Sequence, residues 1–483
     1  MYLGLDLGTS GLRGLLVSES GVPVGDRSVN YSVQNPLEGW SEQDPAEWLT
    51  ACRGVMSQLR QAFPREFAAI RGIGVAGHMH GATVLDHDGA VVRPCILWND
   101  GRAEREAEEL DHDPAFRSLS GNIVFPGFTA PKLLWMSRHE PDAFARVHQV
   151  LLPKDYLVYW LTGRYVSDMS DAAGTSWLNV SGRCWSPELI ERSGMRPDQL
   201  PDLGEGTEIV GAVAPHIATE LELGRHVVVV GGGADNAVAA CGIGALADNQ
   251  SFVSLGTSGV LLAAKDRYSP AADSAVHTFC HAVPGKWYQM GVILSATDSL
   301  NWLADNSRVK VSELVAQLPD RASGPASLLF LPYLSGERTP HNDVRLRGSF
   351  IGLSRSTDAA ALCRSILEGV SFALRDCYEA LQTTGTRLDG VMAIGGGSQS
   401  DFWLHTLAHT LGMPLYRPRK GDFGAAMGAA RLAMVGVEGS APEEIMTPPD
   451  IDTAFEPQSS LLDAYEAAYQ RYRKSYLALK EVL

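Results

Sequence analysis

Apolar and polar residues alternate in blocks along the chain, and the blocks predict a long succession of strands and helices. Short apolar runs that end at glycine or proline, such as 150–152, 226–230 and 390–394, are typical of buried strands. Longer segments with apolar residues on one helical face predict helices at 44–62, 131–139, 311–318, 358–383 and 401–411. Such extended mixing of strands and helices favours layered α/β domains over an all-β sandwich.

One pentapeptide occurs twice, about half a chain apart. Leu7-Gly-Thr-Ser-Gly11 recurs as Leu255-Gly-Thr-Ser-Gly259, each time after an apolar, strand-like segment. Average residue usage would produce some identical pair of pentapeptides in such a chain about one time in ten, so coincidence is disfavoured. We therefore predict two homologous halves, each opening with a β-hairpin around the repeated turn. The hairpin strands are 2–6 with 12–17, and 251–254 with 260–264.

Tyrosines gather on one face of a predicted C-terminal helix. Tyr465, Tyr469, Tyr472 and Tyr476 are separated by alternating steps of four and three residues. Such a face packs either against the protein's own core or against a second copy of the chain. We favour the core, and a homodimer stays open as the alternative.

Composition indicates a folded, soluble chain. Its 483 residues are 45% hydrophobic and 20% charged, which suits more than one domain with a well-packed core. No segment approaches the roughly 20 uninterrupted apolar residues of a membrane-spanning helix, and the N-terminus lacks the basic segment of a secretory signal. The seven cysteines include no Cys-x-x-Cys pair and fit reduced thiols. We therefore expect a cytoplasmic protein with no membrane partner.

The charge balance argues against nucleic acid as a partner. Lysine and arginine number 40 against 56 aspartate and glutamate, a net charge of −16, so a generally basic binding surface is disfavoured. A polyanionic ligand would have to be held locally, by backbone amides, a bound cation or a few basic side chains. The expected partners are therefore small molecules.

The two Gly-Thr-Ser-Gly turns are suited to holding phosphate from both sides. Their glycines allow close backbone approach, and the hydroxyl groups of Thr9, Ser10, Thr257 and Ser258 add donors. Either turn alone is an ordinary hairpin turn, but the pairing favours phosphate between the halves. No P-loop motif, no strand-following G-x-G-x-x-G, no G-x-S-x-G and no H-E-x-x-H occurs, which argues against those enzyme classes.

Two aspartates stand next to these glycine turns. Asp6 ends the first strand immediately before the first turn, where Mg²⁺ would reconcile a carboxylate with phosphates, although an aspartate bonded to its own turn is the simpler alternative. Asp235 follows three consecutive glycines at the start of a helix-like segment. An aspartate is ordinary there, but three glycines lose backbone entropy and suggest a ligand lying against the chain.

Three further segments complete the sequence pattern. A second strand, triple glycine and helix at 395–401 suit a flat ligand such as adenine with its ribose, whereas the small residues at 424–430 predict close helix packing. Polar clusters at 76–81 and 98–102 offer donors and acceptors for sugar hydroxyl groups. The His-x-His within 76–81 lacks a carboxylate or cysteine at ligand spacing, so we favour sugar contact over metal binding. A buried histidine with no ligand is the further alternative.

Taken together, these segments resemble the FGGY family of carbohydrate kinases, and within it most closely the members that act on xylulose. The resemblance covers essentially the whole chain, through 6–11, 40–45, 77–81, 96–102, 128–135, 152–156, 167–175, 231–236, 254–259, 330–340 and 395–397. Two positions depart from the usual pattern: His78 replaces a frequent glutamine and Arg13 replaces a frequent lysine.

The resemblance implies an α/β fold of two actin-like (ribonuclease-H-like) domains with a cleft between them. An N-terminal domain, 1–245, would hold the sugar and the first phosphate loop, and a C-terminal domain, 246–483, would bind the nucleotide and end in the C-terminal helix. The implied reaction is phosphorylation of D-xylulose at its 5-hydroxyl, with ATP and Mg²⁺.

The resemblance also implies roles for individual residues. Asp235 matches the proton acceptor, Asp6 the catalytic carboxylate at Mg-ATP, and Met79 and His80 the residues at the ketose. We further predict that Asn99, Asp100, Asp235 and Asn236 contact the sugar. The predicted nucleotide contacts are Thr9, Ser10, Arg13, Gly256, Thr257, Ser258, Gly396, Gly397 and Asp401.

Three alternatives stay open. A family member could act on another substrate, such as ribulose, arabinitol or glycerol. An actin-like chaperone or filament ATPase would share the fold, but it would not need the clusters at 76–81 and 98–102. A catalytically silent sugar sensor is disfavoured because Asp6 and Asp235 are both present.

Overall fold

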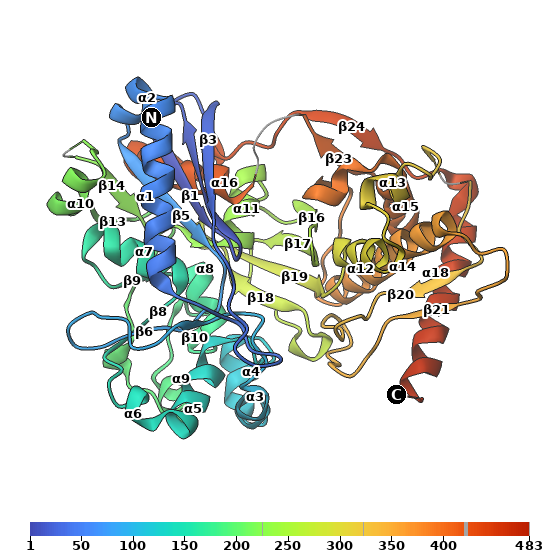
Figure 1. Ribbon diagram of the computed structural model, residues 1–483, viewed down its shortest axis with the longest axis horizontal. Helices are drawn as coiled ribbons and strands as arrows, with labels where there is room; N and C mark the ends of the chain where they lie inside the picture. Colours follow the sequence, from blue (N-terminus) through green and yellow to red (C-terminus); the bar gives the residue numbers. More distant parts are fainter. Residues whose placement is uncertain (225, 322, 420–423, 483) are drawn as a thin grey trace.

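The computed structural model describes residues 1–224, 226–321, 323–419 and 424–482. A β-sheet forms the centre of each half of the molecule (Figure 1). The first sheet has the order β13-β14-β5-β1-β2-β3, with β15 also pairing with β5, and the second has the order β18-β19-β17-β16-β22-β23-β24. The predicted α/β fold with two sheet-based domains is thus confirmed.

The strands of the first sheet are β1 (Tyr2–Leu7), β2 (Gly11–Val17), β3 (Pro23–Asn30), β5 (Gly72–Gly77), β13 (Ile209–Ala212), β14 (Val228–Val230) and β15 (Gly233–Ala234). Those of the second are β16 (Ser251–Leu255), β17 (Gly259–Lys265), β18 (His277–Cys280), β19 (Trp287–Ile293), β22 (Val391–Ile394), β23 (Leu415–Pro418) and β24 (Ile451–Phe455). Short pairs outside them are β4 (Glu42–Gln43) with β7 (Cys95–Ile96), β6 (Thr83–Leu85) with β8 (Gln149–Leu151), β9 (Val166–Asp168) with β12 (Asp202–Gly204), β10 (Leu178–Asn179) with β11 (Cys184–Trp185), and β20 (Leu329–Leu331) with β21 (Ser349–Ile351).

The helices of the first half are α1 (Pro45–Ala62), α2 (Pro64–Ala68), α3 (Glu104–Asp111), α4 (Pro114–Ser120), α5 (Thr129–His139), α6 (Pro141–Phe144), α7 (Pro153–Thr162), α8 (Met169–Ala172), α9 (Pro187–Arg192), α10 (Pro215–Glu220) and α11 (Asp235–Ile243). Those of the second are α12 (Thr297–Ser307), α13 (Val311–Val315), α14 (Ala359–Gln382), α15 (Asp401–Leu411), α16 (Ala425–Glu438), α17 (Pro442–Ile445) and α18 (Ser459–Lys480). None of the helices in the described ranges is both long and apolar enough to cross a membrane.

The repeated pentapeptide occupies the same place in both sheets. In the first half, β1 pairs antiparallel with β2 and parallel with β5. In the second half, β16 pairs antiparallel with β17 and parallel with β22. Each copy of Leu-Gly-Thr-Ser-Gly therefore turns the chain between two central strands, and the two predicted hairpins are confirmed.

Local capping determines where the predicted helices begin and end. The side chain of Asp44 accepts a hydrogen bond from the Ala46 amide, and Pro45 occupies the first turn of α1. The helix predicted at 311–318 is shorter, because α13 ends at Val315. Pro319 disfavours a helical conformation at the residue before it, which accounts for the early end.

The tyrosine face of α18 packs into the core of the second half. Tyr465, Tyr469 and Tyr472 are fully buried there. The Tyr469 hydroxyl donates to Asp376 at 2.5 Å, and the Tyr472 hydroxyl lies 2.7 Å from that of Tyr333. The core-packing interpretation of this helix is confirmed.

Helix α16 returns to the first sheet although it follows the second sheet in sequence, and it packs on β1, β5 and α11 (Figure 1). The contact is between backbones. A Cβ atom added at Gly4 would lie 1.8 Å from the Ala426 carbonyl oxygen, and one at Gly74 would lie 1.9 Å from that of Ala429. The small residues at 424–430 therefore serve close packing, as predicted.

Replacing Gly428 by alanine is expected to destabilise the protein. The added methyl group would meet the Val238 carbonyl oxygen at 1.8 Å, and overpacking typically costs about 1–3 kcal/mol. We expect the melting temperature, measured by calorimetry, to fall by several degrees. Gly224→Ala is the matched control, since its Cβ would meet only Val227 at 3.9 Å among the described residues. Equal melting temperatures for the two variants would contradict the packing argument.

Candidate active site

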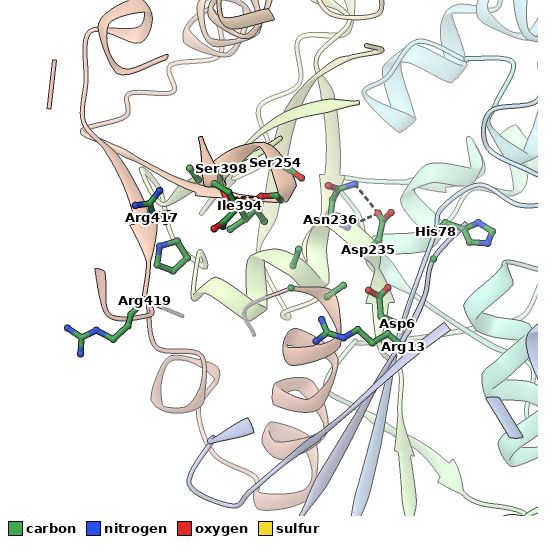
Figure 2. A pocket seen from close by; sticks show the side chains of 18 of the residues that line it. Asp6, Arg13, His78, Asp235, Asn236, Ser254, Ile394, Ser398, Arg417 and Arg419 are labelled. Carbon is green, nitrogen blue, oxygen red and sulfur yellow. Dashed lines mark hydrogen bonds between the residues drawn. The ribbon is translucent and has the colours of Figure 1, made fainter. Parts of the chain in front are cut away.

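A cleft of about 1020 Å³ lies between the two halves. Asp6 of β1 and Asp235 of α11 both line it, and Figure 2 shows their side chains facing the same space. Its walls in the first half also include Gly8, Thr9, Arg13, His78, Asn236 and Ala239. The second half contributes Ser254, Ala393, Ile394, Gly395, Ser398, Gln399, Asp401, Arg417, Pro418, Arg419, Gly424, Ala425 and Asp452.

A second cavity of about 110 Å³ adjoins the cleft. His78, Asp235 and Asn236 line both cavities, so the two meet at these residues. The remaining walls of the smaller cavity, called the small pocket below, are Met79, His80, Trp98, Ser258, Val260, Met290, Val292 and Arg338. Both halves of the chain thus contribute to a space the size of a small molecule.

Asp235 is half-buried where the two cavities meet. One of its carboxylate oxygens accepts hydrogen bonds from the backbone amide of Asn236 at 2.6 Å and from its side-chain amide at 2.9 Å. Burial outweighs these bonds and raises the pKa of Asp235 to about 6. A carboxylate with such a pKa is ionised at neutral pH, yet it accepts a proton more readily than an exposed aspartate does.

The three glycines before Asp235 are required by the surrounding backbone. A Cβ atom at Gly232, whose φ is +73°, would lie 2.0 Å from the Val75 carbonyl oxygen, and one at Gly231 would lie 2.4 Å from that of Glu205. We expected a ligand to explain this sequence. Neighbouring chain segments fill the space instead, and they hold the approach to Asp235 in place.

A buried ion cluster supports the residue before Asp235. The Lys154 ammonium group pairs with Asp155 and, at 3.0 Å, with Asp168. Ser170 donates its hydroxyl proton to Asp168 at 2.5 Å and accepts a hydrogen bond from the Ala234 amide at 3.0 Å. This chain of contacts links the strand β9 to Ala234, the residue immediately before α11.

The histidines of the small pocket are neutral. Burial lowers the pKa of His78 to about 3 and that of His80 well below its usual value. His80 Nδ1 lies 2.7 Å from the Gly174 carbonyl oxygen, and the ring stacks on Phe128 with centroids 4.4 Å apart. No group of three or more His, Cys, Asp or Glu side chains among the described residues has an arrangement that could hold a metal ion.

The structure places the residues predicted for the sugar in two groups. Met79, His80, Asp235 and Asn236 come together in the small pocket. Asn99 is exposed, and Asp100 is buried in an ion pair with Arg102 at 2.7 Å; neither lines the cleft or the small pocket.

Trp98, from the same cluster, does line the pocket, and its Nε1 donates to the Thr9 hydroxyl at 3.0 Å. The cluster at 98–102 was therefore a useful signal, but it did not indicate which of its side chains faces the pocket.

The residues predicted for the nucleotide also occupy different places. Thr9, Arg13 and Asp401 line the cleft, whereas Ser258 lines the small pocket. Ser10 and Gly396 are exposed, and Gly397 is buried against Trp403. The carbonyl oxygens of Gly256 and Thr257 accept hydrogen bonds from the Thr297 and Ala296 amides, at 2.9 and 2.8 Å.

Two arginines of the cleft were missed by the sequence analysis. Arg417 pairs with Asp401 at 2.7 Å, and Arg419 follows immediately after the end of β23. Their only signal is a short basic segment, Arg417-Pro-Arg419, which has no motif of its own.

Comparison with known proteins identifies the family. The xylulose kinase of Escherichia coli K12 is 42% identical over 487 residues, covering 99% of both chains. A crystal structure of a "xyloylose kinase" from Brucella ovis has a TM-score of 0.97 at 53% identity and covers 100% of both chains. Residues 1–242 match the N-terminal domain of the FGGY family of carbohydrate kinases, and residues 251–437 match its C-terminal domain. The chain belongs to the FGGY family of carbohydrate kinases.

Proposed function

We propose that this protein transfers the γ-phosphoryl group of ATP to the 5-hydroxyl of D-xylulose. The observation that carries the proposal is the position of Asp235, which lines both the cleft and the small pocket. Full-length relatives named xylulose kinases support the choice of sugar. A sugar in the small pocket and a nucleotide in the cleft would therefore meet at one carboxylate.

Asp235 would act as the general base. Phosphoryl transfer passes through a loose transition state, so catalysis depends mainly on positioning and on accepting the hydroxyl proton late. The bonds from Asn236 orient the carboxylate, and the ion cluster around Lys154 holds the turn from which it projects. Asn236 and the neutral His80 would bind the sugar beside it.

The residues present fit a magnesium nucleotide. Asp6 is a carboxylate in the same cleft as Thr9 and Arg13, which are suited to phosphate oxygens, and Mg²⁺ commonly takes only one or two protein carboxylates. Asp6 would hold the ion, and Mg²⁺, when bound, neutralises charge on the phosphates. The 395–401 segment and Arg417 line the far side of the cleft and would hold the rest of the nucleotide.

Several finer assignments stay proposals. Five residues predicted at the nucleotide would contribute through the backbone turns that contain them. They are Ser10, Gly256, Thr257, Gly396 and Gly397. Asn99 and Asp100 would act on the sugar through Trp98, because Asp100 is engaged by Arg102. A homodimer also stays a prediction, and the tyrosine face of α18 is not available for it, since it is buried in the core of its own chain.

The sugar is tested directly by a coupled ATP assay over a panel of D-xylulose, D-ribulose, D-arabinitol and glycerol. We expect the highest kcat/KM for D-xylulose. A higher kcat/KM for another sugar of the panel would overturn the assignment of D-xylulose as the substrate, but not the assignment as a kinase.

Replacing Asp235 by asparagine is expected to lower kcat by about 10²–10⁴-fold, because the variant retains the shape of the side chain but cannot accept the proton. D-Xylulose binding, measured by calorimetry, should change little. Asp235→Ala should lose turnover in the same way. Near-normal turnover in either variant would contradict the role of this residue.

The pH profile should reflect the same carboxylate. Because the pKa of Asp235 is raised to about 6, lowering the pH through 6 protonates the base and removes activity. At one pH unit below the pKa only about a tenth of the carboxylate is ionised, so kcat/KM should fall about tenfold there. A profile that stays flat down to pH 5 would argue against this assignment.

Replacing Asp6 by asparagine is expected to raise the Mg²⁺ concentration for half-maximal rate by roughly 10- to 100-fold, as loss of a group that supports a metal typically does. The measurement is a Mg²⁺ titration of the kinase rate at fixed ATP. Asp88→Asn, at an exposed position, is the control. An unchanged Mg²⁺ requirement in Asp6→Asn would count against metal binding by Asp6.

A further inference from the structure

Arg338 brings a positive charge from the second half of the chain into the small pocket. It lies between β20 and β21 and lines the pocket together with His80 and Asp235 of the first half. Its guanidinium group stands over the ring of Phe125, 5.0 Å from the centroid. The family resemblance includes the segment 330–340 but implies no role for Arg338.

The residues on either side of Arg338 are hydrogen-bonded to the end of β19 and to Leu294, which follows it. Glu337 accepts hydrogen bonds from the amides of Leu294 at 3.0 Å and Arg338 at 2.8 Å. Thr339 exchanges two bonds with Val292, each 3.0 Å long, one from its amide and one to its hydroxyl. The Thr339 hydroxyl also donates to the Ala275 carbonyl oxygen at 2.8 Å. Such ties preorganise the position from which the Arg338 side chain extends.

Within the described ranges, the guanidinium group of Arg338 has no ion pair and no hydrogen-bond acceptor. Its ring neighbour is Phe125, and the nearby His80 and His277 are neutral because burial lowers the pKa of both well below the usual value. A guanidinium carries five N–H donors, and those of the half-buried Arg338 are not sealed away from the open space of the pocket. The donors are therefore available to a ligand with oxygen acceptors.

Phosphate is a poor candidate for that ligand. Arg338 does not line the large cleft, and apart from Ser258 the pocket wall from the second half is otherwise the apolar Val260, Met290 and Val292. Asp235, where the phosphoryl group would arrive, forms no ion pair with Arg338, and its pKa is set by burial and Asn236. The two charged groups therefore line the same pocket without contacting each other.

Building on the proposed function, we propose that Arg338 binds the ketone end of the sugar while Asp235 engages the 5-hydroxyl at the other end. In an open-chain ketopentose the end opposite the 5-hydroxyl carries the carbonyl oxygen and the 1-hydroxyl. The planar fork of a guanidinium matches two such neighbouring oxygen atoms. The substrate then bridges the two domains, with His80 and Asp235 on one side and Arg338 on the other.

The test compares steady-state kinetics of Arg338→Met, Arg338→Lys and the wild type with D-xylulose and ATP. Losing a hydrogen bond to a charged group typically weakens binding about 10- to 100-fold. We expect KM for D-xylulose to rise by that factor in Arg338→Met, with KM for ATP within about twofold of the wild type. The KM of Arg338→Lys for D-xylulose should lie between those of the wild type and Arg338→Met, because lysine retains the positive charge but lacks the planar guanidinium fork.

Arg345→Met is the matched control, since it changes an exposed arginine of the same segment, with a side chain 78% accessible. Calorimetric titration of D-xylulose without nucleotide should show the same order of affinities, and an unchanged KM for ATP shows that Arg338→Met is folded. An unchanged KM for D-xylulose, or equal losses for sugar and ATP, would overturn the proposal.

Failure of the proposed function has a different signature. If the wild type does not phosphorylate D-xylulose, the substrate assignment fails, and the variants are then compared on the panel member that the wild type prefers. Preserved affinity for that substrate in Arg338→Met would overturn the role of Arg338 as well.

Discussion

The close contact between backbones at α16 is the constraint on which the active site depends. Asp6 lies on β1 and Asp235 begins α11, and α16 packs against both elements. Glycine makes this contact possible, because any side chain at Gly4, Gly74 or Gly428 would overlap a carbonyl oxygen. The relative positions of the two carboxylates are therefore set by a helix that belongs, in sequence, to the far end of the chain.

Carboxylates in and behind the site have two kinds of surroundings. Around Lys154 one buried ammonium group pairs with the two carboxylates of Asp155 and Asp168, which holds the structure behind the site in one arrangement. At the junction of the cavities Asp235 accepts two amide hydrogen bonds, but burial outweighs them and keeps its affinity for a proton high. The difference separates a carboxylate that supports the fold from one suited to chemistry.

Much of the fold could be predicted from sequence, because hairpins, capped helices and the repeated turn are local patterns. Sequence motifs located the candidate site only where they end on a side chain that lines the cavities, as at Asp6, Asp235 and His80. Arg338 was missed because its place in the small pocket arises from packing between segments far apart in sequence. Trp98 was passed over because a polar cluster does not show which side chain turns inward. The three glycines before Asp235 stand out in the sequence, but it is the close approach of neighbouring backbone that requires them.

The return of α16 also affects how the protein is made. Tyr2, Leu15, Ala76 and Val230 share one core with Met427 and other residues of this helix. While a ribosome synthesises the chain, that face of the first sheet stays uncovered until residues 425–438 have emerged. The N-terminal half must therefore wait for nearly the whole polypeptide before its interior is complete, and in that interval it is the part most exposed to unwanted association.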